Sequence, residues 1–174
     1  MSDIKIRKLS ITELAADAVV NAANSALMMG GGVCGYIFRG AGIAKMTAAC
    51  MKIGHCNTGS AVITPGFNLP AKNVIHAVGP VWHGGRENEA GLLYSAYQSS
   101  LELAKENDLH SIGFPLISAG IYGYPLEQAW ERAISACRDF ISSETDYEID
   151  IIFCVLDDKI MNTGEKILAE LTQG

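Results

Sequence analysis

The sequence predicts an α/β protein: a three-layer α/β/α sandwich around a central, mixed but mostly parallel sheet. Short β-branched or apolar runs alternate with longer segments of helical periodicity from one end of the chain to the other. Several of the short runs are apolar at nearly every position, which is typical of strands covered on both faces. The chain has 174 residues, the length of one domain with a substantial core, so we expect residues 1–174 to form a single domain.

Six segments carry a strand pattern. The first, at residues 4–9, alternates apolar and basic side chains, beginning with Ile4, Lys5 and Ile6, which predicts an exposed or edge strand. The other five expected strands lie within residues 17–23, 60–67, 73–78, 111–117 and 149–156. Ligands of open α/β sheets bind at the carboxyl ends of the strands, so the loops after residues 17–23 and 111–117 are the first candidates for a site.

Four segments are expected to be helical. Apolar residues recur every three or four positions in residues 126–141 and again from Leu93 to Ala104, which predicts two amphipathic helices. A further helix is expected from about Gly35 to Met51, and a last one around residues 160–171. The charged residues 86–89 suit the start of the helix that contains Leu93.

The bulk composition narrows the function classes. A net charge of -6 and an isoelectric point near 5.1 argue against non-specific binding to nucleic acid. The N-terminal residues lack the apolar core of a signal peptide, and no run of about 18 apolar residues occurs, so we expect a cytoplasmic protein that does not associate with membranes. Five scattered cysteines fit reduced thiols better than a disulfide framework.

Two glycine-rich loops follow expected strands and precede expected helices. Gly30, Gly31 and Gly32 remove every side chain, so a ligand can approach the main chain and the start of the next helix. A lone glycine triplet is equally compatible with a flexible turn. In the second loop, Gly120 and Gly123 bracket two residues, and Pro125 suits the first turn of a helix.

Together the two loops could hold one diphosphate between them. Tyr122 would then be free to pack on a sugar or base, although Tyr122 and Tyr124 could instead cap the core. No glycine-lysine-serine or glycine-lysine-threonine sequence is present, and the contiguous glycines do not match the dinucleotide-binding fingerprint. We therefore expect main-chain amides, rather than a lysine, to bind the phosphates.

Three segments in this order and spacing resemble a known family: DAVVNAANSALMMGGGV, CNTGSAVITPGFNLPAKNVIHAVGPVWHGG and FPLISAGIYGYP. The chain resembles a macrodomain, the ADP-ribose-binding module, and in particular its bacterial branch of O-acetyl-ADP-ribose deacetylases and ADP-ribosyl hydrolases. The resemblance implies that ADP-ribose lies across the crest of the sheet, with Asn24 and Tyr122 at the distal ribose and Asn21 mainly bracing its loop. We expect no metal or cofactor. The ligand-binding residues it implies are Ser10, Ile11, Asn21, Asn24, Gly30, Gly31, Gly32, Val33, Tyr36, Ser118, Ala119, Gly120, Ile121 and Tyr122.

The chain departs from that branch at positions expected near the ligand. Ser10 stands where an aspartate receives the adenine amino group, which should loosen adenine discrimination. Cys34 stands where an aspartate is proposed to orient the attacking water. Phe38 replaces a common histidine, and Tyr36 replaces a small residue, so either ring could stack on the ligand or narrow its pocket.

Cys34 and Asn24 are the candidate catalytic residues. A carboxylate that orients or deprotonates water contributes about a hundred- to ten-thousand-fold in rate, which a neutral thiol cannot match. A nucleophilic role for Cys34 is conceivable near a helix N-terminus, but no histidine partner can be assigned, and we favour a passive replacement. Some macrodomains lacking this aspartate are still thought to hydrolyse ADP-ribosyl bonds, so the replacement does not exclude activity.

Three functions remain open. The first is hydrolysis of O-acetyl-ADP-ribose or of mono-ADP-ribosyl-protein bonds at the distal ribose. The second is a module that reads or sequesters ADP-ribose without turnover, which the missing acids favour. The third is a preference for another nucleotide diphosphate or for the end of poly-ADP-ribose. The expected partners are thus ADP-ribose or a derivative, and a mono-ADP-ribosylated protein.

Other polar residues suggest weaker alternatives. Cys50, His55 and Cys56, with Cys34, invite a zinc site, but their spacing matches no standard pattern. We interpret His76 as a hydrogen-bonded residue within the sheet. The acids of residues 86–89, together with Asp157 and Asp158, are interpreted as solvated helix ends rather than a metal site.

Overall fold

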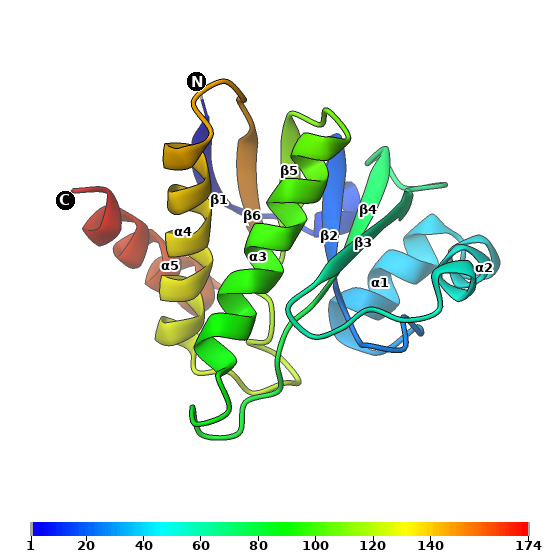
Figure 1. Cartoon of the computed structure of the whole chain (residues 1–174), viewed down its shortest axis with the longest axis horizontal. Coiled ribbons are helices and arrows are strands. Elements are labelled where there is room, and N and C mark those ends of the chain that lie inside the picture. The colour runs from blue at the N-terminus through cyan, green and yellow to red at the C-terminus, as the bar shows by residue number, and fades with distance from the viewer. Residues whose placement is uncertain (1, 174) are drawn as a thin grey trace.

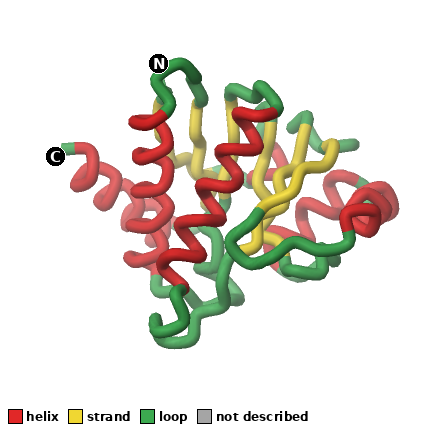
Figure 2. The backbone as a smooth tube through the Cα atoms, in the orientation of Figure 1, coloured by secondary structure: helices red, strands yellow, loops and turns green. Residues whose placement is uncertain are grey.

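In the described part of the chain, six strands form one mixed sheet with helices on both faces (Figures 1 and 2). The computed structural model of the chain describes residues 2–173. The strands are β1 (Asp3–Lys8), β2 (Ala18–Ala23), β3 (Ala61–Pro65), β4 (Asn73–Val78), β5 (Ser111–Phe114) and β6 (Asp150–Val155). The helices are α1 (Gly32–Ala41), α2 (Ile43–Ile53), α3 (Glu89–Glu106), α4 (Leu126–Ser143) and α5 (Asp158–Thr172), with a short 3-10 turn at Ile11–Glu13.

The strands lie in the order β1-β6-β5-β2-β4-β3, and every neighbouring pair is parallel except β3 with β4. The mixed, mostly parallel sheet predicted from the sequence is therefore confirmed. The alternating strand β1 lies at one edge, as its basic side chains indicate. Because β1, β6, β5 and β2 are adjacent and parallel, their carboxyl ends lie side by side at one edge of the molecule.

Two apolar cores, one on each face of the sheet, give the three layers. On one face, α3, α4 and α5 pack over the central strands, and the fully buried rings there include Tyr97, Trp130 and Phe153. On the other face, α1 and α2 cover β2 and β4, with Ile37 and Met46 fully buried. Both faces of the sheet are thus shielded from water, which explains why the inner strands are apolar at nearly every position.

The prediction of a single helix from about Gly35 to Met51 was wrong, because these residues belong to two helices. α1 begins at Gly32 and ends at Ala41, and α2 begins at Ile43. Gly42, between them, has a φ of 107°, which side chains with a Cβ rarely adopt. Because the apolar spacing continues through both halves, periodicity alone gave no sign of this break.

Glu89 is not a solvated helix end. Its side chain is buried, at 1% exposure, and accepts hydrogen bonds from the backbone amides of His83, Gly85 and Glu87. Burial acts to raise the pKa of this carboxyl group, but the hydrogen bonds from surrounding backbone amides lower it to about 2. Glu89 therefore fastens the loop between β4 and α3 to the start of α3.

None of the helices within residues 2–173 combines the length and the hydrophobicity that a membrane span requires.

Candidate ligand-binding cleft

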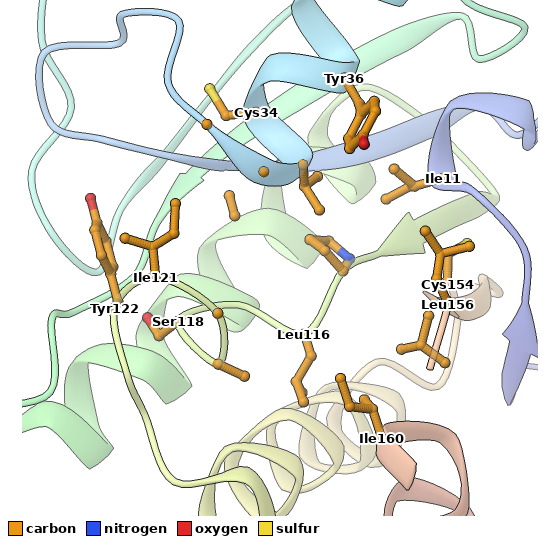
Figure 3. Close-up of a pocket in the computed structure, with 18 of the residues that line it drawn as sticks. Ile11, Cys34, Tyr36, Leu116, Ser118, Ile121, Tyr122, Cys154, Leu156 and Ile160 are labelled. Atoms are coloured by element: carbon orange, nitrogen blue, oxygen red, sulfur yellow. The ribbon is translucent and has the colours of Figure 1, made fainter. Parts of the chain in front are cut away.

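A cleft of about 600 Å³ opens at the carboxyl ends of β1, β6, β5 and β2 (Figure 3). Both glycine-rich loops predicted as candidates line it. The loop after β2 and the first turn of α1 form one wall, and the loop after β5 forms the opposite wall. Both loops therefore meet at one edge of the sheet, where the strand-end rule places ligands of such sheets.

The first wall presents bare main chain. Gly31 precedes the first turn of α1 and has no side-chain cap, and Gly32 adopts a φ of 57°. Within residues 2–173, no acceptor takes a hydrogen bond from the amides of Gly31, Gly32 or Val33. Three N–H groups at the start of a helix are therefore left for a ligand, and the helix dipole favours an anion there.

The second wall repeats this arrangement. Hydrogen bonds from Tyr124 N to Ser118 O (2.9 Å) and from Gly123 N to Gly120 O (3.0 Å) close the loop on itself. In the described part of the chain, the amides of Gly120, Ile121 and Tyr122 donate to no acceptor. A second set of free N–H groups thus follows β5.

The two walls approach each other closely. Ile121 is 82% exposed, and its Cδ1 lies only 3.5 Å from where a Cβ at Gly31 would stand. Tyr122 is half-buried and lines the cleft, whereas Tyr124 is buried against Trp82, with ring centroids 4.8 Å apart. Of the two tyrosines, Tyr124 is the one that caps the core.

Asn24 lines the cleft but already braces its own loop. Its Nδ2 donates to Met28 O (2.9 Å), and its Oδ1 accepts from Met28 N (3.0 Å). One amide hydrogen and one lone pair remain, since an asparagine side chain can make about four hydrogen bonds. Asn24 can therefore both hold the loop and contact a ligand hydroxyl.

Cys34 is tied into the protein by its sulfur. The thiol is 5% exposed, and its Sγ accepts hydrogen bonds from Gly30 N (3.4 Å) and Asn21 Nδ2 (3.6 Å). The S–H group points to Met28 O, 3.7 Å away. The amide of Gly30 is thus used by Cys34, which leaves Gly31 as the first free amide of this loop.

Asn21 lies behind the cleft rather than in its lining. It is 1% exposed, and its Nδ2 also contacts His76 Nδ1 at 3.0 Å, while His76 Nε2 contacts Thr64 Oγ1 at 2.9 Å. His76 is fully buried within the sheet, as predicted, and burial lowers its pKa to about 4. Because Asn21 stands between them, the neutral imidazole of His76 does not contact Cys34.

The other substituted positions fall into two groups. Ser10 and Tyr36 line the cleft, where Ser10 Oγ pairs with Thr12 Oγ1 at 2.7 Å and Tyr36 is 58% exposed. Phe38 does not: it is 1% exposed and meets His76 edge-on, with centroids 6.4 Å apart. The expectation that Phe38 could stack on the ligand or narrow its pocket was wrong, because this ring lies on the face of α1 that packs on the sheet.

Sequence reasoning missed one whole end of the cleft. The residues after β6 and at the start of α5 line it, and Asp157 does so while its Oδ1 caps α5 by accepting from Ile160 N (3.0 Å). Applying the strand-end rule to residues 149–156 would have found them. The lining residues not predicted are Leu9, Ala22, Pro115, Leu116, Cys154, Val155, Leu156, Asp157 and Ile160.

The residues considered for zinc do not come together. Within residues 2–173, no group of three or more histidine, cysteine, aspartate or glutamate side chains is arranged to hold a metal ion. His55 Nε2 pairs with Asn57 Oδ1 at 2.8 Å, and burial raises the pKa of the Cys50 thiol to about 11, which disfavours the thiolate that zinc binds.

The fold and the cleft define an α/β protein in which, within residues 2–173, unpartnered main-chain amides line the cleft and no lysine or arginine does. The family model described as Macro domain matches residues 20–133. The chain belongs to the macrodomain family, as its relatives also show.

Three comparisons illustrate this membership. A macro domain-containing protein of Chlorobaculum tepidum is 51% identical over 162 residues, covering 93% of each chain. A protein of Escherichia fergusonii named O-acetyl-ADP-ribose deacetylase is 46% identical over 173 residues, covering 97% of each. The solved structure of the Oceanobacillus iheyensis macrodomain with ADP has a TM-score of 0.91 and 32% identity, covering 97% of this chain and 90% of that one.

Proposed function

We propose that this protein binds ADP-ribose and hydrolyses a bond at its distal ribose, in O-acetyl-ADP-ribose or in mono-ADP-ribosylated protein. The proposal depends on two sets of amides that have no acceptor within residues 2–173, Gly31 to Val33 and Gly120 to Tyr122, on the two walls of one cleft. Such amides bind a diphosphate without any cationic side chain. The deacetylase name of the E. fergusonii relative and the ADP in the O. iheyensis structure support the choice of ligand and reaction.

With the diphosphate between the two loops, the distal ribose falls at the end of the cleft that holds Asn24, Cys34 and Tyr122. Asn24 offers one free N–H and one lone pair to a ribose hydroxyl, and Tyr122 offers a ring face to the sugar. Water placed there would be oriented by these groups and by the substrate's own phosphate, since within residues 2–173 no carboxylate lies at this end of the cleft.

A specific observation favours a second candidate, a module that binds ADP-ribose without turnover. Cys34 Sγ already has two N–H donors and its S–H a carbonyl acceptor, so the side chain at this position has no evident means of activating water. Within residues 2–173 the one carboxylate in the lining is that of Asp157, which follows β6, and β5 separates β6 from β2 and the Asn24 that follows it. In this second candidate the cleft binds ADP-ribose but has no general base to activate water.

Calorimetric titration with ADP-ribose, ADP and AMP tests the ligand. We expect ADP-ribose to bind at least about ten-fold more tightly than AMP, because AMP lacks the second phosphate that the opposed amides would share. Equal and weak binding of all three nucleotides would refute the proposal.

A matched pair of variants isolates one amide. Gly31 has a φ of -83°, close to the value that proline requires, so Gly31→Pro removes a single N–H with little backbone strain. Gly31→Ala keeps the N–H and adds a Cβ at ordinary contact distance from Ile121. Affinity for ADP-ribose should fall about ten-fold in Gly31→Pro and much less in Gly31→Ala, and an equal effect of both would contradict the amide cradle.

Turnover distinguishes the two candidates. The protein is incubated with O-acetyl-ADP-ribose and, separately, with a mono-ADP-ribosylated protein, and the release of acetate or of ADP-ribose is measured. Release above the uncatalysed rate supports the hydrolase. Tight binding of ADP-ribose with no release from either substrate supports the binding module.

A further inference from the structure

The end of the cleft remote from Tyr122 is lined by apolar side chains, which suit a flat aromatic ring. Figure 3 shows Ile11, Cys154, Leu156 and Ile160 grouped there, away from Ser118, Ile121 and Tyr122. Apolar walls with a few placed polar groups are the usual lining for a nucleobase. If a diphosphate lies between the two glycine-rich loops, the base of the nucleotide falls at this apolar end.

The register of the sheet brings two polar residues to this end of the cleft. β1 and β6 are parallel neighbours, and the last paired residues are Lys8 and Val155. Two residues further along each chain stand Ser10 and Asp157, and both line the cleft. Neighbouring strands lie about 5 Å apart. A ligand group that contacts the residues after β1 can therefore also reach the residues after β6.

Of these two residues, Asp157 has an oxygen, Oδ2, that can still accept a hydrogen bond. The hydroxyl of Ser10 is occupied by Thr12, whose Oγ1 is 2.7 Å away and whose N–H donates at 3.4 Å. Asp157 uses Oδ1 for the cap of α5, and within residues 2–173 nothing pairs with its Oδ2.

Asp157 is also the charged side chain of the cleft lining. The neighbouring ammonium of Lys8 pairs with Asp158 at 2.8 Å, and no lysine or arginine of the described chain is among the lining residues. An anionic oxygen at the rim of an apolar slot selects a hydrogen-bond donor. The exocyclic amino group is the donor that distinguishes adenine from an otherwise identical purine.

We propose that Asp157 is the specificity-determining residue for the base, with Oδ2 accepting a hydrogen bond from the exocyclic amino group of adenine. This inference rests on the proposed binding of ADP-ribose. The sequence suggested that Ser10, after β1, weakens the discrimination of adenine from other bases. We assign that discrimination instead to Asp157, after β6.

Calorimetry with ADP-ribose and with its analogue carrying unsubstituted purine tests this role. The wild type should prefer ADP-ribose by about ten-fold, the effect of one hydrogen bond to a charged acceptor. Asp157→Asn keeps an oxygen to cap α5 but loses the anion, so the preference should fall to about two-fold or less. Asp158→Asn is the matched control, because it neutralises the next residue, which does not line the cleft, and it should keep the preference.

The outcomes separate this inference from the proposed function. Binding of ADP-ribose with an unchanged preference in Asp157→Asn would overturn the role of Asp157 alone. Failure of the wild type to bind either nucleotide would overturn the proposed function and this inference with it. The double variant Ser10→Asp with Asp157→Asn should regain the preference, and if it does not, the two register-matched positions are not equivalent and the register argument is wrong.

Discussion

Cys34 brings a buried thiol to the lining of the cleft. Its sulfur accepts N–H groups from Gly30 and Asn21, both of which could serve a carboxylate equally well. The surroundings of this side chain therefore supply hydrogen-bond donors suited to an anion, although the side chain present is a thiol.

Restoring an acid at this position should raise hydrolysis. In Cys34→Asp the carboxylate would keep both N–H donors and could orient water, and we expect the rate of acetate release from O-acetyl-ADP-ribose to rise by about a hundred-fold. Cys34→Ser, which is neutral and similar in size, is the control and should show no such gain. Unchanged turnover with ADP-ribose binding retained would show that Cys34 is not what limits activity.

His76 makes stability depend on pH. Its pKa falls from 6.5 to about 4 on folding because the ring is buried, so below pH 6.5 the unfolded chain binds a proton that the folded protein excludes. The stabilisation is complete above pH 6.5 and is lost as the pH falls towards 4, by about 3 kcal/mol over that window.

Denaturant unfolding at several pH values measures this effect. His76→Gln should flatten the dependence of the unfolding free energy on pH between 6.5 and 4. His55→Gln removes an exposed histidine and should retain the wild-type slope. An identical slope in His76→Gln would mean that the buried ring is not responsible.

At the scale of elements, the break between α1 and α2 depends on one backbone conformation. Gly42→Ala must place a Cβ on a residue with φ of 107°, and that Cβ would lie 3.4 Å from Asn68 Nδ2. We expect a loss of about 1–2 kcal/mol in the free energy of unfolding, measured by denaturant titration. Gly120→Ala is the control, since an added Cβ there meets nothing within 4 Å, and equal stability of both variants would contradict this account.

The strands and most helices could be predicted because their apolar spacing reflects burial directly. β2, β4 and β6 fall within the expected segments, since strands covered on both faces are apolar throughout. The division at Gly42 could not be predicted from spacing, because a glycine in a helical pattern is compatible with continuation. The prediction for Glu89 was wrong for a similar reason. Its carboxylate accepts hydrogen bonds from backbone amides, and no side-chain pattern in the sequence indicates such contacts.

The candidate site was predicted where glycines marked it. The loops containing Gly31 and Gly120 carry a composition that indicates main-chain contact with a ligand. Leu156, Asp157 and Ile160 carry no such mark, and they join the cleft only because β6 lies between β1 and β5 in the sheet. That order is a property of the tertiary fold and is not visible in local sequence.

At the scale of the whole molecule, charge distribution sets the salt dependence of binding. The protein carries a net charge of -6, and within residues 2–173 no lysine or arginine lines the cleft. Amides hold a diphosphate by short-range hydrogen bonds, whereas the long-range field of the protein repels it, and salt screens that repulsion.

The affinity for ADP-ribose should therefore stay constant, or rise by up to about two-fold, as sodium chloride is raised from 50 to about 500 mM. Arg39, whose guanidinium lies 5.0 Å over the ring of Tyr36, is the cation to check. A several-fold loss of affinity with salt that disappears in Arg39→Gln would show that Arg39 contributes to binding, contrary to this account.

The position of a bound diphosphate tests the central claim most directly. In a crystal structure with ADP-ribose, phosphate oxygens should lie within hydrogen-bond distance of the amides of Gly31 to Val33 on one side and Gly120 to Tyr122 on the other. A nucleotide bound with its phosphates away from both loops, or held by lysine or arginine side chains, would contradict it.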